Sequence, residues 1–274
     1  CRAALCSRAL QHTGTGSSTM DEGKKYYTIG SVEKVCDLLD TLSKKSSWEL
    51  NELATEVGLP KTSVHRFLLT LADKGFVVQE KRRGRYSLSY KLFSIGSKVV
   101  EKTGLLKIAR PYLERILTEI DETVNLAVPS GTEMLVIDKQ VSSHALRQEV
   151  RLGSTFPMIN SASGRIFLAF SEEEERKRLL SQIAAEGGET VQSKIELFRE
   201  RFALIRSTGV EEDDEEQYEG IRCIAVPVLD GENVACGAVS VSIPTLRYRD
   251  ELVHRAREIA VEQASLISRR MGAG

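Results

Sequence analysis

Residues 50–74 carry the pattern that most restricts how this chain folds. A short helix has its apolar residues on one face, at Leu50, Leu53, Ala54 and Val57. Gly58 breaks it, and a second helix opens at Pro60, where the missing N–H has no partner to lose. This second helix buries Val64, Phe67, Leu68 and Leu71. Two short helices around a glycine turn predict a helix-turn-helix, although an ordinary helical hairpin has the same periodicity.

A third helix is predicted just before this pair. Ser31 is a plausible N-cap for it, because a serine hydroxyl accepts from the N–H groups of a first turn. Apolar residues then recur at helical spacing: Val32, Val35, Cys36, Leu38, Leu39 and Leu42. We expect this face to pack across the two shorter helices.

After Gly75 the pattern changes from helical to extended. Residues 76–78 and 86–88 are two short strand-like runs around a basic turn, which predicts a β-hairpin, the wing of a winged helix-turn-helix. A solvated turn would look similar in isolation, but its place after the helix pair favours contact with phosphates or a narrow minor groove. The predicted contacts of the wing are Lys81, Arg82, Arg83 and Arg85.

The second helix of the pair is the candidate for reading bases. With its apolar residues turned inward, a step of about 100° per residue sends Thr62, His65 and Arg66 outward, and leaves Lys61 and Ser63 at the exposed first turn. Arg66 suits a guanine edge, whereas Lys61, Thr62 and Ser63 suit phosphates and thymine methyl groups.

The charge distribution agrees with an anionic partner for the front half alone. The chain has 274 residues, which suits two domains, and its net charge is only −1. From Met20 to Thr103 there are 15 lysine and arginine residues against 11 acidic ones, a net charge of +4. From Gly104 onward there are 21 against 28, a net charge of −7.

Several classes of protein do not fit the sequence. No apolar run approaches the roughly 18 residues of a membrane span. The five cysteines form no CxxC pair, so neither a disulfide framework nor a zinc site is indicated, and we expect a reducing cytoplasm, no metal and no cofactor. Residues 1–19 are small, polar and unpatterned, as in a disordered leader, an upstream extension or a remnant of cloning.

The rear half alternates helices and strands. Residues 90–104 are predicted to be a linker helix, and a long helix with a regular apolar face follows. Strand-like runs at 123–128, 134–138, 223–228 and 238–243, an extended segment at 144–151 and further helices indicate an α+β domain. The predicted domains are 20–89, 90–104 and 105–274.

Six segments of the chain match the motifs of one family. They are SVEKVCDLLD, GLPKTSVHRFL, ETVNLAV, SASGRIFLAF, GVEEDDEEQYEGIRCIAVPVLD and GAVSVSIP. From Tyr27 to Gly272 the chain resembles the IclR family of bacterial transcriptional regulators. The rear signature has Gly209, Asp213, Glu216, Cys223, Ile224, Ala225, Val228 and Asp230 at the family's spacing, and Leu229 departs from the usual aromatic residue or histidine.

The resemblance implies a winged helix-turn-helix joined to a GAF-like effector-binding domain, acting as a dimer or a dimer of dimers. It places a pocket for a small organic acid at Gln148, Phe156, Ala162, Ser163, Asp213, Cys223, Ser240 and Ser242. Ser240 and Ser242 are two apart on a strand and so share a face. The helix after SASG offers N–H groups to a carboxylate, and Asp213 can accept from a ligand hydroxyl.

These residues also have plainer interpretations. Asp213 lies in an acidic run, which is typical of a solvated face. Cys223 fits a small buried hydrophobe, and the two serines fit an outer sheet face. Arg165, where the family commonly has lysine, fits a helix cap or a surface residue.

The main functional hypothesis is a ligand-responsive transcription factor, with a repressor favoured over an activator. As a dimer it would bind a pseudo-palindromic double-stranded DNA operator, and a small carboxylate would change that binding. One alternative is a hydrolase-like enzyme with Cys223 or Ser163 as nucleophile and His144 or His254 as base, but there is no nucleophile elbow and no HExxH motif. Another is a protein-docking module, against which the basic wing tip argues.

Overall fold

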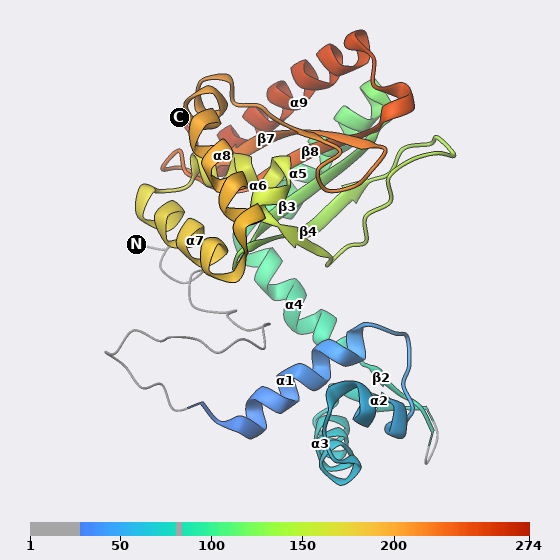
Figure 1. The fold of residues 1–274 in the computed structure, drawn as a ribbon. Helices are drawn as coiled ribbons and strands as arrows, with labels where there is room; N and C mark the ends of the chain where they lie inside the picture. The colour runs from blue at the N-terminus through green and yellow to red at the C-terminus, as the bar shows by residue number, and fades with distance from the viewer. Residues whose placement is uncertain (1–27, 81–83) are drawn as a thin grey trace. The chain divides into compact units, whose positions relative to one another are not determined.

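The structure is a computed structural model that describes residues 28–80 and 84–274. The chain divides between Lys102 and Thr103 into two compact units, each with its own core (Figure 1). The predicted leader and three of the predicted wing contacts, Lys81, Arg82 and Arg83, lie outside the described residues.

The first unit is a winged helix-turn-helix, as predicted. Its elements are α1 (Gly30–Ser43), α2 (Leu50–Val57), α3 (Lys61–Asp73), β1 (Val77–Gln79), β2 (Tyr86–Leu88) and α4 (Tyr90–Thr103). The core is formed by apolar side chains of α1, α2, α3 and the hairpin: Leu38, Leu42, Trp48, Leu53, Ala54, Val64, Leu68, Leu71, Val77 and Tyr86.

The turn between α2 and α3 depends on Gly58. Its φ of 69° and ψ of 28° place it in the left-handed region, which a residue with a Cβ adopts only at a cost. At the other end of α2, Glu49 and Glu52 form a reciprocal capping box that satisfies first-turn N–H groups. Pro60 is the N-cap of α3 and precedes its first turn at Lys61, one residue later than predicted.

Two expectations for α1 are wrong. The helix begins at Gly30 with Ile29 as N-cap, and no side chain caps it, so Ser31 lies inside the first turn. Val32 is 55% exposed and Cys36 is exposed as well, because the first turns of α1 extend past the core that Leu38 and Leu42 enter.

The wing is an antiparallel hairpin in which Val77 pairs with Leu88 and Gln79 with Tyr86. Trp48, just before α2, forms a β-bridge with Tyr86 and thereby ties the hairpin to the helix pair. Both rings are buried, so the wing is fixed at its base by the same core as the helices.

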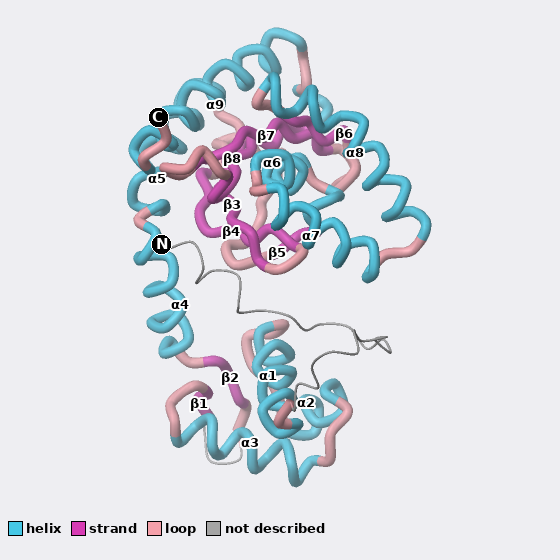
Figure 2. The backbone as a smooth tube through the Cα atoms, turned by 90° about the vertical axis from the view of Figure 1, so that its left-hand side faces the viewer, coloured by secondary structure: helices cyan, strands magenta, loops and turns pink. Residues whose placement is uncertain are grey.

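The second unit is built on one six-stranded antiparallel sheet in the order β5-β4-β3-β8-β7-β6. Helices cover both faces, α5 and α9 on one and α6, α7 and α8 on the other (Figures 1 and 2). The elements are α5 (Leu105–Ile120), β3 (Thr123–Ser130), β4 (Glu133–Gln140), β5 (Thr155–Pro157), η2 (Met158–Asn160), α6 (Ala162–Phe170), α7 (Glu173–Glu186), α8 (Glu189–Thr208), β6 (Glu211–Asp214), β7 (Ile221–Leu229), β8 (Ala235–Pro244), η3 (Thr245–Arg247) and α9 (Asp250–Met271).

The edge strands of this sheet differ from the sequence-based expectation. The segment 144–151, expected to be extended, joins no strand of the sheet, and the short strands β5 and β6 were not expected. The acidic run has no apolar alternation, yet it pairs with β7 and buries Glu211 and Asp213. A strand of three or four residues is too short for its alternation of apolar and polar residues to be recognised from the sequence.

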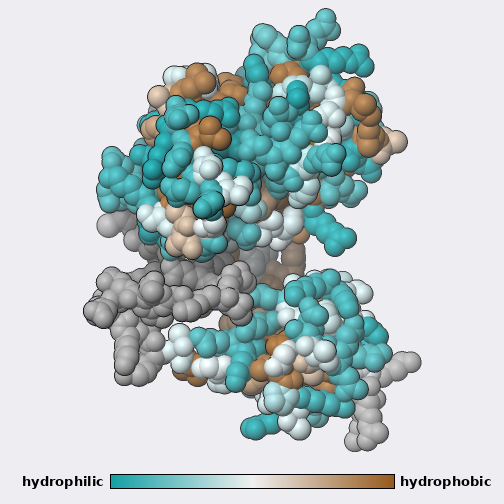
Figure 3. All heavy atoms as spheres, in the orientation of Figure 1, coloured by the Kyte–Doolittle hydropathy of each residue, from teal (hydrophilic) through white to brown (hydrophobic). Residues whose placement is uncertain are grey.

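The face of the molecule that Figure 3 shows is mostly hydrophilic. On the face that Figure 3 shows, hydrophobic side chains form separate patches among polar ones. Over the described residues, no helix combines the length and apolar composition needed to cross a bilayer.

Candidate DNA interface and ligand pocket

Helix α3 presents a polar outer face opposite its buried side. Lys61, Thr62, His65 and Arg66 are exposed, as predicted, whereas Ser63, which was also expected at an exposed first turn, is half-buried. Within the described part of the chain, the side chains of Lys61, Thr62 and Arg66 form no hydrogen bond or ion pair. Two cations and a hydroxyl on one short helix, next to a wing, are therefore available to an anionic surface.

Arg85 was predicted to be a cation of the wing tip that contacts DNA, but its guanidinium is engaged in contacts within the first unit. Its Nε donates to Ser47 Oγ at 2.8 Å and its Nη2 to the Ser47 carbonyl at 3.0 Å. Nη1 also lies 3.1 Å from Glu49 Oε1. The guanidinium thus holds the start of β2 against the segment before α2, and sequence spacing could not show this because the partners are 36 to 38 residues away.

The pocket of the second unit is organised by a row of paired residues across the sheet. Asp213 on β6 pairs with Cys223 on β7, and Cys223 pairs with Ser242 on β8. In the next row, Ser240 pairs with Asn125 on β3. Directly paired residues of antiparallel strands share a face, so these side chains converge on the side that α6 covers.

The structure brings together every effector-site residue predicted from the sequence. The common cavity is lined by Gln148, Phe156, Ala162, Ser163, Asp213, Cys223, Ser240 and Ser242, and also by Asn125, Val150, Ser161, Gln217 and Tyr218. Its volume is only about 20 Å³, which is room for about one water molecule. The two serines therefore face the interior, and the alternative of an outer sheet face is wrong.

Helix α6 brings its N-terminus to this cavity. Ser161 is the N-cap, and its Oγ accepts from the N–H of Gly164 at 3.1 Å. The close packing of α6 against η2 requires glycine at position 164, because a Cβ there would lie 2.1 Å from the Met158 carbonyl oxygen. The first-turn N–H groups at Ala162 and Ser163 have no partner within the helix and point toward the pocket end.

Two side-chain oxygens of the lining are buried without a partner among the described residues: Asn125 Oδ1 and Gln148 Oε1. Asn125 Nδ2 donates to Ser242 Oγ at 3.4 Å, which directs the oxygen away from that serine. A buried acceptor without a donor is costly, so both atoms favour a ligand that donates. Asn125 was missed in the sequence, although a polar residue inside the apolar strand TVNLAV is a signal for it.

Arg165 is neither a cap nor a surface residue. Its buried guanidinium donates from Nε to Glu211 Oε1 at 2.7 Å, from Nη2 to the Glu212 carbonyl at 2.8 Å and from Nη1 to the Ile159 carbonyl at 3.2 Å. Nη1 also reaches Glu216 Oε2 at 3.1 Å. Arg165 therefore joins α6 to β6, the strand that carries Asp213.

Burial dominates the acid–base properties of the pocket. It raises the pKa of the Asp213 carboxyl above its usual value. The backbone N–H of Glu216 donates to Asp213 Oδ1 at 2.8 Å and lowers this pKa, but the effect of burial is larger. Burial also raises the pKa of the Cys223 thiol to about 12. This thiol is protonated at neutral pH and a poor nucleophile. Cys223 is half-buried and lines the pocket, so it is not the fully buried hydrophobe of the plainer interpretation.

The catalytic alternative finds no support in this arrangement. His144 lies beside Asp121 and His254 beside Glu258 on α9, and neither histidine lines the pocket that contains Cys223 and Ser163. Over the described residues, no group of three or more His, Cys, Asp or Glu side chains is placed to hold a metal ion.

A winged helix-turn-helix followed by an α+β domain with a small polar-lined pocket defines the class of DNA-binding regulators. The comparisons with known proteins agree: residues 31–81 match the IclR helix-turn-helix domain, and residues 97–269 match the C-terminal domain of the bacterial transcriptional regulator IclR. The chain belongs to the IclR family and is a DNA-binding transcriptional regulator.

Individual relatives cover nearly the whole chain. It is 33% identical over 270 residues to the HTH-type transcriptional regulator KdgR of Dickeya chrysanthemi, covering 98% of this chain and 88% of the relative. It is 32% identical to the transcriptional repressor IclR of Escherichia coli K12, covering 88% and 89%. The crystal structure of the Thermotoga maritima IclR superposes with a TM-score of 0.69 at 27% identity, covering 89% and 99%.

Proposed function

We propose that this protein is a ligand-responsive repressor whose first unit binds a DNA operator and whose second unit binds a small organic acid that alters operator affinity. The observation that carries the proposal is that the first unit has an exposed cationic face on α3, while the second unit has a small polar-lined pocket. A regulator of this kind would act in the cytoplasm, where the chromosome is accessible.

In the DNA complex, α3 would lie in the major groove. Arg66 would contact a guanine edge, Lys61, Thr62 and Ser63 would contact phosphates and thymine methyl groups, and His65 would lie beside them. Arg85 would act indirectly, by holding the wing through Ser47 and Glu49.

The pocket suits an acid that also carries hydroxyl groups. Among the described residues, Asp213 is the only charged one that lines the pocket. A ligand carboxylate would therefore be held by the first-turn N–H groups of α6 and by serine hydroxyls. The unpartnered oxygens of Asn125 and Gln148 would accept from ligand hydroxyls. Because the cavity is so small, the lining must move outward around such a ligand, and a site that opens on binding can couple the ligand to a change of conformation.

Self-association would use the exposed apolar side chains of α4. Tyr90 is 91% exposed and Phe93 74% exposed, and Val99 is exposed on the same helix. Large apolar side chains gathered on one exposed helix are typical of an interface. Two copies joined here would present two α3 helices to a pseudo-palindromic operator.

DNA binding is tested by measuring affinity for duplexes selected from a random library over a range of salt concentrations. The logarithm of the binding constant should fall linearly with the logarithm of salt concentration, with a slope of about −0.9 per phosphate contact.

Phe93→Asp tests self-association: it should reduce binding to the duplex with two half-sites and lower the molecular mass measured by light scattering. Absence of binding to any duplex at low salt would overturn the proposal.

The ligand class is tested by a thermal-shift screen of the full chain against matched acids, such as gluconate and hexanoate. A hydroxylated acid should raise Tm, whereas its alkyl counterpart should have little effect. Asp213→Ala and Ser240→Ala should abolish the shift and the effector response while leaving the DNA affinity of the free protein intact. If both variants respond as the wild type does, the effector binds elsewhere.

A further inference from the structure

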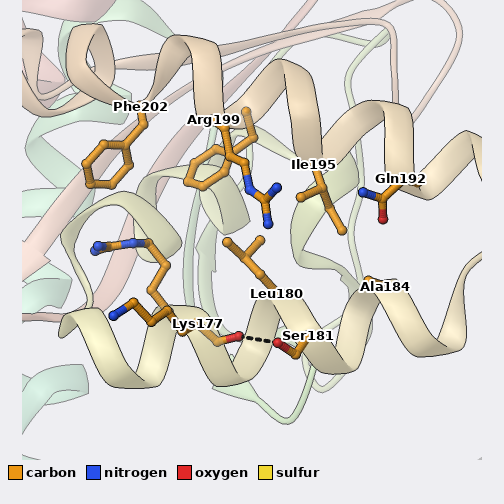
Figure 4. A pocket seen from close by; sticks show the side chains of 10 residues that line it. Lys177, Leu180, Ser181, Ala184, Gln192, Ile195, Arg199 and Phe202 are labelled. Atoms are coloured by element: carbon orange, nitrogen blue, oxygen red, sulfur yellow. Dashed lines mark hydrogen bonds between the residues drawn. The ribbon is translucent and has the colours of Figure 1, made fainter.

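A second cavity lies outside the effector pocket, between helices α7 and α8. Its volume is about 460 Å³, within the usual range of small-molecule sites. Its floor is apolar and consists of Leu180 from α7 and Ile195 and Phe198 from α8, all buried. Figure 4 shows Ile195 and Arg199 reaching from α8 toward Leu180 on α7. This α7–α8 cavity shares no residue with the effector pocket.

The rim of the α7–α8 cavity is cationic. Arg176, Lys177 and Arg199 line it, and none of the aspartates and glutamates in the described ranges does. Lys177 is already paired with Glu173 at 2.7 Å and Glu174 at 3.3 Å. Arg199 has no hydrogen bond or ion pair among the described residues, so its five N–H donors are available at the mouth of an apolar cavity.

Arg176 is held in place beside it. Its guanidinium lies 4.5 Å from the centre of the Phe202 ring, and its Nη1 donates to the Ser171 carbonyl at 3.3 Å. Phe202 in turn contacts Phe198 edge to face, with ring centres 6.0 Å apart. The contacts leave most of the Arg176 donors free and fix its position, because a guanidinium over a ring is oriented by cation–π attraction.

We propose that the α7–α8 cavity is a second ligand site, for a compact organic anion with a flat or branched apolar body. The body would bury against Leu180, Ile195 and Phe198, and the anionic group would accept from Arg199 and Arg176. An arginine fork matches a carboxylate in a bidentate arrangement, and the apolar floor excludes a fully hydrated inorganic anion as the best occupant. Site and ligand class are independent of the effector proposed above.

The site is tested on the full-length protein with 2-naphthoate as probe, followed by its fluorescence, and with neutral 2-naphthamide as the matched uncharged compound. Naphthoate should bind saturably with one site per chain, and naphthamide about tenfold or more weakly, because a charge-assisted hydrogen bond is lost. Arg199→Gln should weaken naphthoate by a similar factor, with little effect on naphthamide.

Two further variants locate the bound probe. Gln192→Trp places a large side chain at an exposed lining position of α8 and should block entry without disturbing the core. Arg178→Gln is the matched control, because Arg178 is an exposed cation of α7 that pairs with Glu175 and does not line the cavity. This control should bind naphthoate as the wild type does.

Three results would overturn the proposal. The first is no saturable naphthoate binding up to millimolar concentration. The second is an affinity that neither Arg199→Gln nor Gln192→Trp changes. The third is loss of binding in the double variant Asp213→Asn/Ser240→Val with full binding in Arg199→Gln, which would place the probe in the effector pocket.

Discussion

Arg165 and Glu211 form a buried ion pair that connects helix α6 to strand β6, with Nε and Oε1 2.7 Å apart. Both side chains are almost fully shielded from solvent, at 5% and 1% exposure. The pair holds the first turns of α6, which offer N–H groups to the effector pocket, in a fixed place relative to Asp213 on the same strand as Glu211.

Removing one partner of this pair should destabilise the effector domain strongly. Arg165→Gln leaves Glu211 buried with its charge uncompensated on that side, and such a loss costs about 3 to 5 kcal/mol. Urea unfolding followed by far-UV circular dichroism measures it. Trp48, the single tryptophan, lies in the first unit, and its fluorescence transition should not change.

A matched substitution checks this interpretation. Arg201 also lies near Glu211, at 3.2 Å, but its side chain is 46% exposed. Arg201→Gln should therefore cost less than about 1 kcal/mol. An equal loss for both arginines would show that burial of the pair is not what matters.

The pH dependence of stability should change in Asp213→Asn. Burial raises the folded-state pKa of Asp213, so the folded protein binds this proton more tightly than the unfolded chain does. Ionisation of Asp213 therefore lowers stability as pH rises above the usual carboxyl range, and asparagine removes that loss. At pH 7.5 the variant should have a Tm equal to or a few degrees above the wild type, and this advantage should shrink as pH falls toward 4. If instead the Tm of the wild type rises relative to that of the variant as the pH increases, the assignment of a raised pKa to Asp213 is contradicted.

Two neighbouring leucines of α3 should respond differently to truncation. Leu68 is fully buried, so Leu68→Ala removes apolar contacts and leaves a cavity, at a cost of about 2 to 5 kcal/mol. Leu69 is 53% exposed, and Leu69→Ala should change the unfolding free energy by less than about 0.5 kcal/mol. Trp48 fluorescence in urea reports both values. Equal effects would mean that α3 has a different face toward the core.

Replacing Gly58 should lower the free energy of unfolding of the first unit because of the backbone conformation alone. A Cβ at this position meets nothing within 4 Å, so the cost of Gly58→Ala is that of the left-handed conformation, about 1 to 2 kcal/mol. Gly58→Asn should cost less, because asparagine tolerates this region better. Chemical denaturation of the two variants side by side tests the order, and an alanine variant as stable as the wild type would exclude the mechanism.

Arg66→Ala should weaken specific DNA binding by about 1 to 3 kcal/mol and relax the preference at one base pair. Lys61→Ala is the comparison, because loss of a phosphate contact should weaken all sequences alike and reduce the salt slope by about 1. Binding to a library of single-base variants of the selected operator measures both. Unchanged selectivity in Arg66→Ala would reject Arg66 as a base reader.

Local patterns in the sequence determined the helices, the glycine turn and the wing, because helical and strand periods follow from which residues must face a core. That is why four of the five residues predicted for the outer face of α3, all but the half-buried Ser63, are exposed. The residues proposed for the effector site came from motifs of the family, and the serine pair at 240 and 242 also from strand alternation; the structure places them around one cavity.

Only the tertiary structure decided which charged side chains are buried and which residues they contact. Arg165 contacts Glu211 across 46 residues and Arg85 contacts Ser47 across 38, and no local pattern encodes such distances. The acidic run became the edge strand β6 because β7 pairs with it, which buries Asp213 and raises its pKa. Desolvation and cross-strand register depend on the assembled sheet, whereas periodicity depends only on neighbours along the chain.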